Sequence, residues 1–409
     1  MRIAIVHWTR AVVGGAERYL RALVPRLLEK GHELSIAFET DAWAGSPAID
    51  PPGSDLAKWQ IDPSRVADAV CVVRAWNPDV VYMHGLQSVA LETALVRVAP
   101  SVIFLHGHYG TCATGQKRHT RPRIVACTRT FGIPCLAVNY LRGCGSRSPV
   151  GLARFYRSQR GRAALFPHFR ELMVASQYMR TEYLRHGVAA ERLHVVHLPP
   201  TDLAPDGVPP APRGVSGRVL FLSRLDKLKG GAHLVPAIAL ASAALGRSLS
   251  LVVAGAGQEE SRLRSLAQRL GVSAEFTGFV DGERRLDLLR AADVVAVPSL
   301  FPEPFGLTGI EAGCVGVPAV AYDFGGVREW LDPGISGEVA AADPPTPEGL
   351  AQALARALSD HGHYTALRRG AWETARRFSM DKHLEVLLTL LATAAGGTSP
   401  GGVPAREVT

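Results

Sequence analysis

Residues 199–212, Pro-Pro-Thr-Asp-Leu-Ala-Pro-Asp-Gly-Val-Pro-Pro-Ala-Pro, divide the chain and thereby decide its fold. Six of these 14 residues are proline. Proline fixes φ and has no N–H to donate, so neither a helix nor a central strand tolerates this density. We therefore predict a linker at residues 200–216. The chain has 409 residues, which is enough for a domain on each side of it.

On both sides of the linker, short apolar stretches alternate with segments of helical periodicity. The predicted strands span residues 3–7, 33–38, 79–84, 102–106, 172–176 and 194–198, and then 218–223, 250–254, 275–280, 293–298 and 318–322. Apolar strands separated by helices are typical of parallel sheets built from βαβ units. We expect an α/β fold with two doubly wound domains, residues 1–199 and 217–379. Their strands would present their carboxyl ends to one central cleft.

The two ends of the chain carry further expectations. A final helix is predicted at residues 380–395 and is expected to pack back on the first domain, whereas the Gly/Pro-rich residues 396–409 are expected to be disordered. No apolar stretch reaches the ~18–20 residues that a membrane-spanning helix needs. The first seven residues predict a strand rather than the apolar core of a signal peptide. We expect a cytoplasmic protein that can lie peripherally at the cytoplasmic face of the membrane.

The net charge of +8 is unevenly distributed. Residues 1–200 carry 25 Lys and Arg against 14 Asp and Glu, whereas residues 201–409 carry 20 against 23. Between Glu92 and Glu171 there are 13 basic residues and no acidic one. Such a field favours an anionic partner, which can be nucleic acid, an anionic membrane or a phosphate-bearing substrate. The alternative is that an arginine-rich composition, 39 Arg against 6 Lys, raises the charge without a function.

Residues 298–312, Pro-Ser-Leu-Phe-Pro-Glu-Pro-Phe-Gly-Leu-Thr-Gly-Ile-Glu-Ala, follow a predicted buried strand. Two prolines hold the loop extended, and Gly306 permits close backbone approach before a helix begins near Thr308. A helix N-terminus offers N–H groups and a positive dipole end to a phosphate. Glu303 in the loop and Glu311 in the helix can accept hydrogen bonds from sugar and ribose hydroxyls. The alternative is an ordinary strand-loop-helix unit in which Glu complements the dipole.

Two shorter motifs also follow predicted strands. Residues 223–231, Ser-Arg-Leu-Asp-Lys-Leu-Lys-Gly-Gly, place Arg224 and Lys229 where they can neutralise a leaving diphosphate. A solvated charged turn is the alternative here. Gly14 and Gly15 join the first strand to the first helix and permit a ligand to approach the helix N-terminus. They do not form the full G-x-G-x-x-G pattern of dinucleotide-binding folds.

Taken in order, these motifs resemble those of family 4 of the retaining glycosyltransferases, which have a GT-B fold of two Rossmann-like domains. The resemblance spans about residues 1–380 and is most specific at the pair of glutamates. The motifs that carry it are Gly14-Gly15-Ala16-Glu17, Gly31-His32-Glu33-Leu34, His106, Val174-Ala175-Ser176, Ser223-Arg224-Leu225, Lys229-Gly230, Gly255-Ala256-Gly257, Gly278-Phe279-Val280, Glu303 to Glu311 with Phe305-Gly306, and Gly325-Gly326 with Glu329.

The resemblance implies that a sugar is transferred from a nucleotide-diphosphate sugar, a UDP- or GDP-sugar, to a polysaccharide, glycolipid or other acceptor. No cofactor is implied, and the transfer would be metal-independent with retained configuration. Four residues would be catalytic. Arg224 and Lys229 would hold the diphosphate, Glu303 would contact the donor sugar, and His106 would lie beside the reacting sugar.

Further residues are implied to bind the donor. Glu311 would bind the ribose and Val280 would line the base pocket through its main chain. Gly14 and Gly15 would approach the phosphates from the other domain. Backbone N–H groups would bind sugar and phosphate oxygens at four consecutive positions, Phe305, Gly306, Leu307 and Thr308.

The chain departs from the family pattern in two places. Ser223 stands where a glycine is usual, and Pro199-Pro200-Thr201-Asp202 replaces an Asn-Gly turn, which alters the entry to the hinge. Neither change touches the cations that would hold the donor. Nowhere does the sequence place two aspartates with one residue between them, the pair that metal-dependent glycosyltransferases of the other main fold use. This fits a mechanism in which Arg224 and Lys229 replace the metal.

Residues 107–170 form a basic insertion that is longer than a βα connection needs. It contains seven Phe and Tyr side chains, and we hypothesise that it meets an anionic lipid head group or a phosphate-linked acceptor. A solvated arginine-rich insertion is the alternative. It also contains four cysteines, which could bind a structural metal, form disulfides or remain thiols, at Cys112, Cys127, Cys135 and Cys144. Cys71 and Cys314 are predicted to be buried.

Two other functions compete with sugar transfer. An anion- or nucleic-acid-binding protein would use the basic stretch at residues 93–170, but that stretch has no recognisable nucleic-acid motif, so a nucleic-acid partner is not expected. It would also leave the clustered charges at Arg224, Lys229, Glu303 and Glu311 unexplained. A GT-B enzyme could instead keep the donor site and act as an epimerase or a hydrolase.

Overall fold

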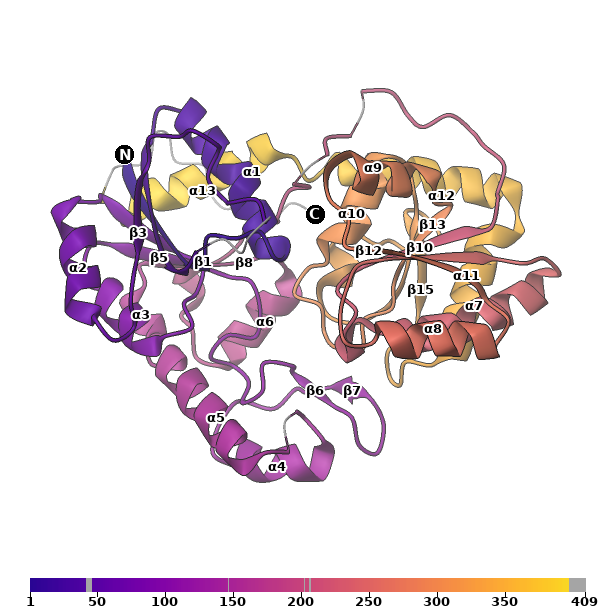
Figure 1. Cartoon of the computed structure of the whole chain (residues 1–409), viewed down its shortest axis with the longest axis horizontal. Coiled ribbons are helices and arrows are strands. Elements are labelled where there is room, and N and C mark those ends of the chain that lie inside the picture. The colour runs from indigo at the N-terminus through magenta and orange to yellow at the C-terminus, as the bar shows by residue number, and fades with distance from the viewer. Residues whose placement is uncertain (42–45, 146, 202, 206, 397–409) are drawn as a thin grey trace.

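The computed structural model describes residues 1–41, 46–145, 147–201, 203–205 and 207–396. The chain folds into two α/β halves that lie side by side, each built around one parallel sheet (Figure 1). The predicted fold class is thus confirmed. The tail at residues 397–409, for which we predicted disorder, lies outside the described residues.

The first sheet has seven parallel strands in the order β3-β2-β1-β4-β5-β8-β9. Its strands are β1 (Arg2–Thr9), β2 (Glu33–Thr40), β3 (Ala57–Gln60), β4 (Val80–Met83), β5 (Ser101–Leu105), β8 (Glu171–Val174) and β9 (Leu193–Val195). The helices between them are α1 (Gly15–Glu29), α2 (Val66–Ala75), α3 (Val89–Leu95), α6 (Gln177–Arg185) and the short η1 (Phe166–His168) and η2 (Ala190–Arg192).

Strand β1 shows why this sheet needs helices on both faces. Ile3 and Ile5 pack into one core cluster, whereas Ala4 and Val6 pack into another. Side chains alternate along a strand, so these clusters lie on opposite faces of the sheet. A strand that is buried on both faces is expected in a sheet that helices cover on each side.

The second sheet has six strands in the order β12-β11-β10-β13-β14-β15, again all parallel. Its strands are β10 (Arg218–Leu222), β11 (Ser250–Ala254), β12 (Ser273–Gly278), β13 (Val294–Val297), β14 (Ala319–Tyr322) and β15 (Gly337–Ala340). Its helices are η3 (Lys227–Lys229), α7 (Gly231–Leu245), α8 (Glu260–Arg269), α9 (Gly282–Ala291), α10 (Leu307–Cys314), η4 (Gly326–Glu329), α11 (Pro347–Ser359) and α12 (His361–Ala375).

The last helix, α13 (Met380–Ala394), follows the second half in sequence but lies across the first half, against β4 and β5 (Figure 1, yellow). His383 fixes it there, because Nε2 lies 2.8 Å from the hydroxyl of Tyr19 and Nδ1 lies 2.8 Å from the carbonyl oxygen of His197. An ion pair between Arg26 and Asp381 adds to this contact at the surface.

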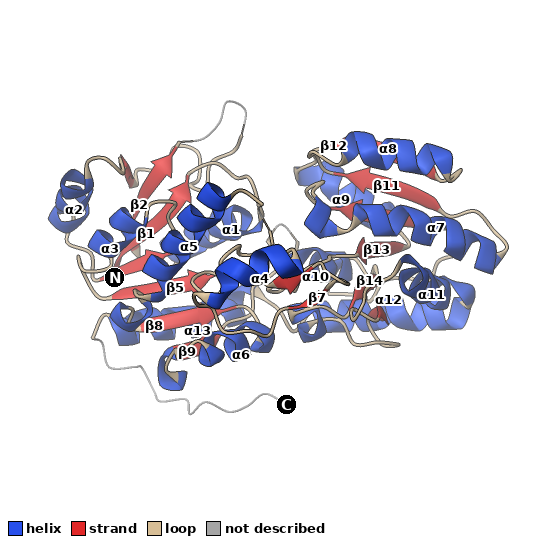
Figure 2. Ribbon diagram, turned by 90° about the horizontal axis from the view of Figure 1, so that it is seen from below, coloured by secondary structure: helices blue, strands red, loops and turns tan. Residues whose placement is uncertain are grey.

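The basic insertion forms a small substructure that projects from the first half (Figure 1). In the view from below, α4 and α5 lie in front of other elements (Figure 2). It consists of a hairpin of β6 (Arg118–His119) and β7 (Val125–Ala126), followed by α4 (Pro134–Arg142) and α5 (Pro149–Ala163). Buried Arg118 ties the hairpin to the second half by donating to the carbonyl oxygen of Leu300 at 2.7 Å.

Two parallel strands were missed by the sequence analysis, and their composition explains why. The edge strand β3 alternates half-buried and exposed residues, and β15 is only four residues long and starts with glycine. Neither has the continuous apolar run of a central strand.

One expectation about membrane-spanning segments needs correction. Lys227–Leu245 has the length and the mean hydropathy, 1.4, of a spanning helix. In the structure this stretch is η3 followed by α7. Leu234, Ile238 and other α7 side chains lie in the second core, where the helix packs against α11 and α8. Its apolar composition therefore serves a core helix.

Candidate active site

A cleft of about 740 Å³ separates the two halves. Loops that follow the strands of both sheets line it, as the predicted orientation of the strands requires. All the residues assigned to catalysis or donor binding line this cleft, namely Gly14, Gly15, His106, Arg224, Lys229, Val280, Glu303, Phe305, Gly306, Leu307, Thr308 and Glu311. The four cysteines of the insertion do not.

Lys229 and Glu303 form an ion pair at the centre of the second-domain wall. Nζ of Lys229 lies 2.6 Å from Oε1 of Glu303, and the hydroxyl of Ser299 donates to the same oxygen. Lys229 ends η3, and the Oδ1 atom of Asp226 caps this turn by accepting from the backbone N–H of Leu228 and of Lys229. The carboxylate therefore lies beside a fixed cation.

Gly230 explains how the turn that carries Lys229 comes so close to the opposite loop. Its φ is +75°, and a Cβ built on it would lie 1.8 Å from the carbonyl oxygen of Pro298. Only glycine fits this close contact between the β10 and β13 loops.

Glu311 lies inside α10, where it pairs with Arg285 of α9. Both side chains are almost fully buried, and Glu311 also accepts from the hydroxyl of Thr201 at 3.0 Å. Sequence analysis missed Arg285. The signal was present, because Arg285 and Leu289 are four apart and form the buried stripe of α9. An arginine at a position of an apolar stripe needs a buried partner.

Arg224 differs from the other cations of the cleft. Its side chain is 72% exposed and its nearest carboxylate, on Asp226, is 3.8 Å away. An exposed guanidinium at a cleft wall can form bidentate hydrogen bonds to a phosphate without losing a buried partner.

Residues 302–306 are held from both halves of the molecule. Gly306 has a φ of +94° and is the N-cap of α10, and the indole N–H of Trp330 donates to the carbonyl oxygen of Phe305 at 2.6 Å. From the first half, the hydroxyl of Ser176 donates to the carbonyl oxygen of Pro304 at 2.6 Å. The helix N-terminus is thus positioned by contacts across the cleft.

The first half contributes the glycine turn. A Cβ on Gly15 would meet Cδ1 of Leu307 at 3.8 Å, so the turn lies opposite the start of α10. One turn further along α1, Arg18 approaches the carbonyl oxygen of buried Val280 at 3.5 Å and pairs with Asp281. These contacts bring the two sides of the cleft together near the predicted donor site.

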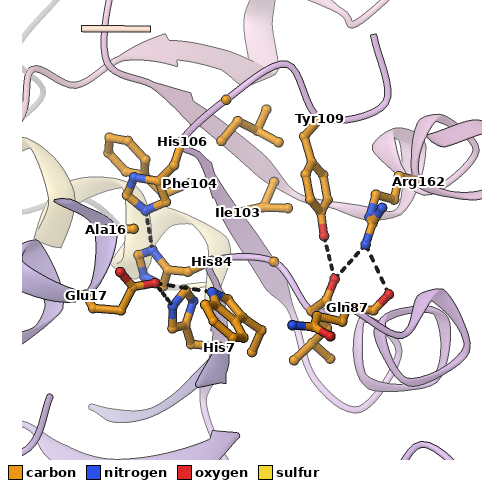
Figure 3. A pocket seen from close by; sticks show the side chains of 15 residues that line it. His7, Ala16, Glu17, His84, Gln87, Ile103, Phe104, His106, Tyr109 and Arg162 are labelled. Atoms are coloured by element: carbon orange, nitrogen blue, oxygen red, sulfur yellow. Dashed lines mark hydrogen bonds and ion pairs between the residues drawn. The ribbon is translucent and has the colours of Figure 1, made fainter. Parts of the chain in front are cut away.

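A second pocket, of about 400 Å³, opens beside the cleft in the first half (Figure 3). It shares Glu17 and His106 with the cleft. Glu17 accepts from the indole N–H of Trp8 at 3.2 Å and its Oε1 lies 2.8 Å from Nε2 of His7. His106 Nε2 lies 2.9 Å from Nδ1 of His84. One wall of the pocket is therefore a chain of imidazoles with a buried carboxylate.

Burial keeps two imidazoles of this wall, those of His84 and His106, neutral. It lowers the pKa of His106 to about 3 and holds the pKa of His84 well below its usual value. The pKa of Glu17 is lowered by its hydrogen bond with His7 against the opposing effect of burial. At neutral pH the wall thus offers the neutral rings of His84 and His106 and one carboxylate.

Arg162 forms the opposite side of this pocket (Figure 3). It donates to the carbonyl oxygens of Leu86 and Gln87 at 2.7 and 3.2 Å and lies over the ring of Tyr109. Its Nε atom is 3.7 Å from Glu92, whose pKa burial raises to about 7. Arg162 is therefore already engaged by the protein.

The four cysteines of the insertion form no disulfide. His119 Nδ1 lies 3.4 Å from the Sγ atom of Cys144, and burial with the nearby thiols raises the pKa of Cys144 to about 12. Within the described residues, no group of three or more His, Cys, Asp or Glu side chains is arranged to hold a metal ion. Cys314 is buried as predicted, whereas Cys71 is exposed, which corrects that expectation.

Comparison with known families matches both halves of the chain. Residues 13–199 match the family model "Glycosyltransferase Family 4", and residues 213–374 match "Glycosyl transferases group 1". The chain is 32% identical over 247 residues to a D-inositol 3-phosphate glycosyltransferase of Xylanimonas cellulosilytica, which covers 55% of this chain and 57% of that protein. It is 35% identical over 146 residues to a glycosyltransferase of Methanocaldococcus jannaschii, over 35% and 36% of the two chains. The alignments span 57% and 36% of the length of these relatives.

Solved structures show the same fold. HepE of Anabaena in complex with UDP and glucose has a TM-score of 0.71 at 19% identity, covering 96% of this chain and 100% of that one. WaaG, a glycosyltransferase involved in lipopolysaccharide biosynthesis, has a TM-score of 0.63 at 18% identity, over 98% and 100%. With both family models matched in order and the two-sheet architecture shared, this chain belongs to the family 4 glycosyltransferases of the GT-B fold.

Proposed function

We propose that this enzyme transfers a sugar from a nucleoside-diphosphate sugar to a hydroxyl group of a glycan or glycolipid, with retention of configuration and without a metal ion. The observation that carries the proposal is the convergence of Arg224, the Lys229–Glu303 pair and the N-terminus of α10 on one cleft. Cations and a helix N-terminus suit a diphosphate, and carboxylates suit the hydroxyls of a sugar.

The donor would lie along the second-domain wall. Arg224, which is exposed, would bind the diphosphate, together with Lys229 and the first N–H groups of α10. Glu311 would bind ribose hydroxyls, with Arg285 holding its carboxylate in place. Structures of HepE contain UDP with glucose, or UDP-glucose, which supports a nucleotide-sugar donor in this fold.

Transfer would need no enzyme nucleophile. The bond between the anomeric carbon and the diphosphate oxygen breaks, and the acceptor oxygen bonds to that carbon from the same face. The acceptor proton passes to the leaving diphosphate. Lys229 and Arg224 stabilise the charge on the diphosphate, and Glu303 faces the positive charge that develops on the sugar.

The acceptor would occupy the pocket of Figure 3, next to His106. Its wall offers the Glu17 carboxylate and the neutral imidazoles of His84 and His106, and Arg162 is engaged by backbone carbonyls. A phosphate would lie against the Glu17 carboxylate there. It would also have to compete with the backbone carbonyls for Arg162. An uncharged sugar or polyol unit is therefore the acceptor group that this chemistry favours.

Calorimetric titration with UDP, GDP and ADP tests the donor site. We expect one of the three to bind, and Arg224→Ala to weaken it by at least about tenfold, since a hydrogen bond to a charged group contributes about 1.5–3 kcal/mol. Arg269→Ala changes an exposed arginine on α8, away from the cleft, and should leave the affinity unchanged. If the folded protein binds none of the three, the proposal is wrong.

Product analysis with the matching nucleotide sugars tests the chemistry. Proton NMR of the product gives its anomeric configuration, and turnover in EDTA tests metal independence. Release of free sugar at the same rate with and without every acceptor would favour a hydrolase instead.

A further inference from the structure

The basic insertion exposes an unusual number of large apolar side chains. Five of the 11 exposed large hydrophobic residues of the described chain lie in it, at Ile133, Tyr140, Leu141, Val150 and Phe155. Leu141 is 73% exposed and Val150 is 80% exposed. Single exposed apolar residues are ordinary, but a concentration of them in one substructure marks an interaction surface.

Helix α4 arranges part of this set along one face. Ile133 is its N-cap, and Ala137, Tyr140 and Leu141 follow at spacings of three to four residues. All four are exposed, whereas Asn139 on another face is buried. Residues at this spacing share one side of a helix, so α4 presents an apolar stripe to the outside.

Helices α4 and α5 and the turn between them also carry exposed arginines without compensating acids. Exposed arginines lie at the end of α4, in the turn after it and along α5, at Arg142, Arg147, Arg154, Arg157 and Arg160. None of these five forms an ion pair with any described residue. The sequence has no acidic residue from 93 to 170. We call helices α4 and α5 together the α4–α5 hairpin. Its surface is therefore both apolar and strongly cationic.

We propose that the α4–α5 hairpin docks on the surface of an anionic lipid bilayer. Aliphatic side chains of an interfacial helix enter the boundary between head groups and acyl chains, while arginines extend to the lipid phosphates. Anionic lipids supply the opposite charge that the hairpin lacks. A nucleic acid would satisfy the arginines but has no apolar layer for Ile133, Leu141 and Val150, so the observations favour a membrane.

Helix α5 connects this surface with the pocket beside the cleft. Its first turn carries Val150, and its last turn carries Arg162, which lines the pocket (Figure 3). These residues lie about 18 Å apart along the helix axis at 1.5 Å per residue. Figure 1 shows α5 running from the body of the first half outward to α4. The docking does not depend on the proposed transfer reaction, but it would hold the pocket close to an acceptor carried by a lipid.

Co-sedimentation of the full-length protein with vesicles tests the proposal. We expect binding to phosphatidylcholine mixed with phosphatidylglycerol, at least about tenfold weaker binding to phosphatidylcholine alone, and loss of binding as NaCl rises, because salt screens exposed charges. No binding of the folded protein to anionic vesicles at low salt would overturn it.

Two pairs of substitutions locate the surface. Ile133→Glu with Leu141→Glu, and separately Arg154→Glu with Arg157→Glu, should each lower vesicle binding by at least about tenfold. The matched controls Ile335→Glu and Arg269→Glu change an exposed apolar and an exposed basic residue of the second half, and should bind like the wild type. Two outcomes would contradict membrane docking. One is vesicle binding that survives in both pairs of α4–α5 hairpin variants. The other is a wild type that binds RNA but not vesicles and loses its RNA binding in these variants. Circular dichroism and nucleotide titration show whether each variant is folded.

Discussion

Lys229 Nζ lies 2.6 Å from Glu303 Oε1, although 74 positions separate the two residues in sequence. The pair joins the loop after β10 to the loop after β13, two strands that are neighbours in the sheet. A cation for the diphosphate and a carboxylate for the sugar are thus positioned by each other. Any change to one of them acts on the other.

Glu303→Gln should separate nucleotide binding from transfer. The substitution removes a negative charge beside Lys229, so the nucleoside diphosphate should bind as tightly as in the wild type or up to about tenfold tighter. Sugar transfer should fall by at least about 100-fold, the scale of losing one electrostatic contact to the transition state. Calorimetry and initial rates measure the two effects. Lys229→Gln is the comparison, since it should weaken nucleotide binding. Equal weakening in both variants would contradict this account.

Arg285→Met should destabilise the second half strongly. It leaves the carboxylate of Glu311 buried without its cation, and breaking a buried pair typically costs about 3–5 kcal/mol. Arg284→Met changes the exposed neighbour and should stay within about 0.5 kcal/mol of the wild type. Urea unfolding measures both. The double variant Arg285→Met, Glu311→Gln should recover part of the lost free energy of unfolding. If Arg285→Met alone costs less than about 1 kcal/mol, the pair is not buried in solution.

Gly230→Ala and Gly246→Ala compare two glycines with similar backbone conformations. Their φ values are +75° and +63°, but only Gly230 has an atom, the carbonyl oxygen of Pro298, in the path of a Cβ. Gly246→Ala should cost about 1–2 kcal/mol from the left-handed conformation alone. Gly230→Ala should cost more than about 4 kcal/mol and weaken nucleotide binding, because the turn that carries Lys229 must move. Thermal unfolding and calorimetry give both quantities, and equal costs would contradict the close contact.

The neutral histidines should make stability depend on pH. Burial lowers the pKa of His106 from 6.5 to about 3, so the folded state binds this proton less readily than the unfolded state. The stability that neutral His106 contributes to the folded state is therefore fully present above pH 6.5 and is lost as the pH falls towards 3. Between pH 6.5 and 4.5, the free energy of unfolding should fall less steeply in His106→Gln than in the wild type, by about 1.4 kcal/mol per pH unit.

Chemical denaturation at a series of pH values measures this slope. His361→Gln, which alters an exposed histidine outside this pocket, is the control. Parallel profiles for wild type and His106→Gln would mean that His106 titrates normally in the folded protein.

The sequence by itself determined the two-domain architecture and the order of most elements. Apolar strands that are buried on both faces and separated by helices leave a parallel sheet as the way to cover each strand. The strand at residues 250–254 was predicted with the bounds that the structure has. Because parallel strands place their carboxyl ends on one edge, the motifs after those strands had to meet at one cleft.

Only the tertiary structure decided which charges meet. Arg285 comes from a helix that carries no recognisable motif, and its pairing with Glu311 depends on how α9 packs against α10. The sequence also could not predict that Ile133 and Leu141 are exposed. An apolar stripe at helical spacing predicts a buried face, and only the packing shows that this one is uncovered. Local sequence limits what each segment can form. Burial and pairing arise from contacts between segments distant in the chain, and these exist only once both sheets are assembled.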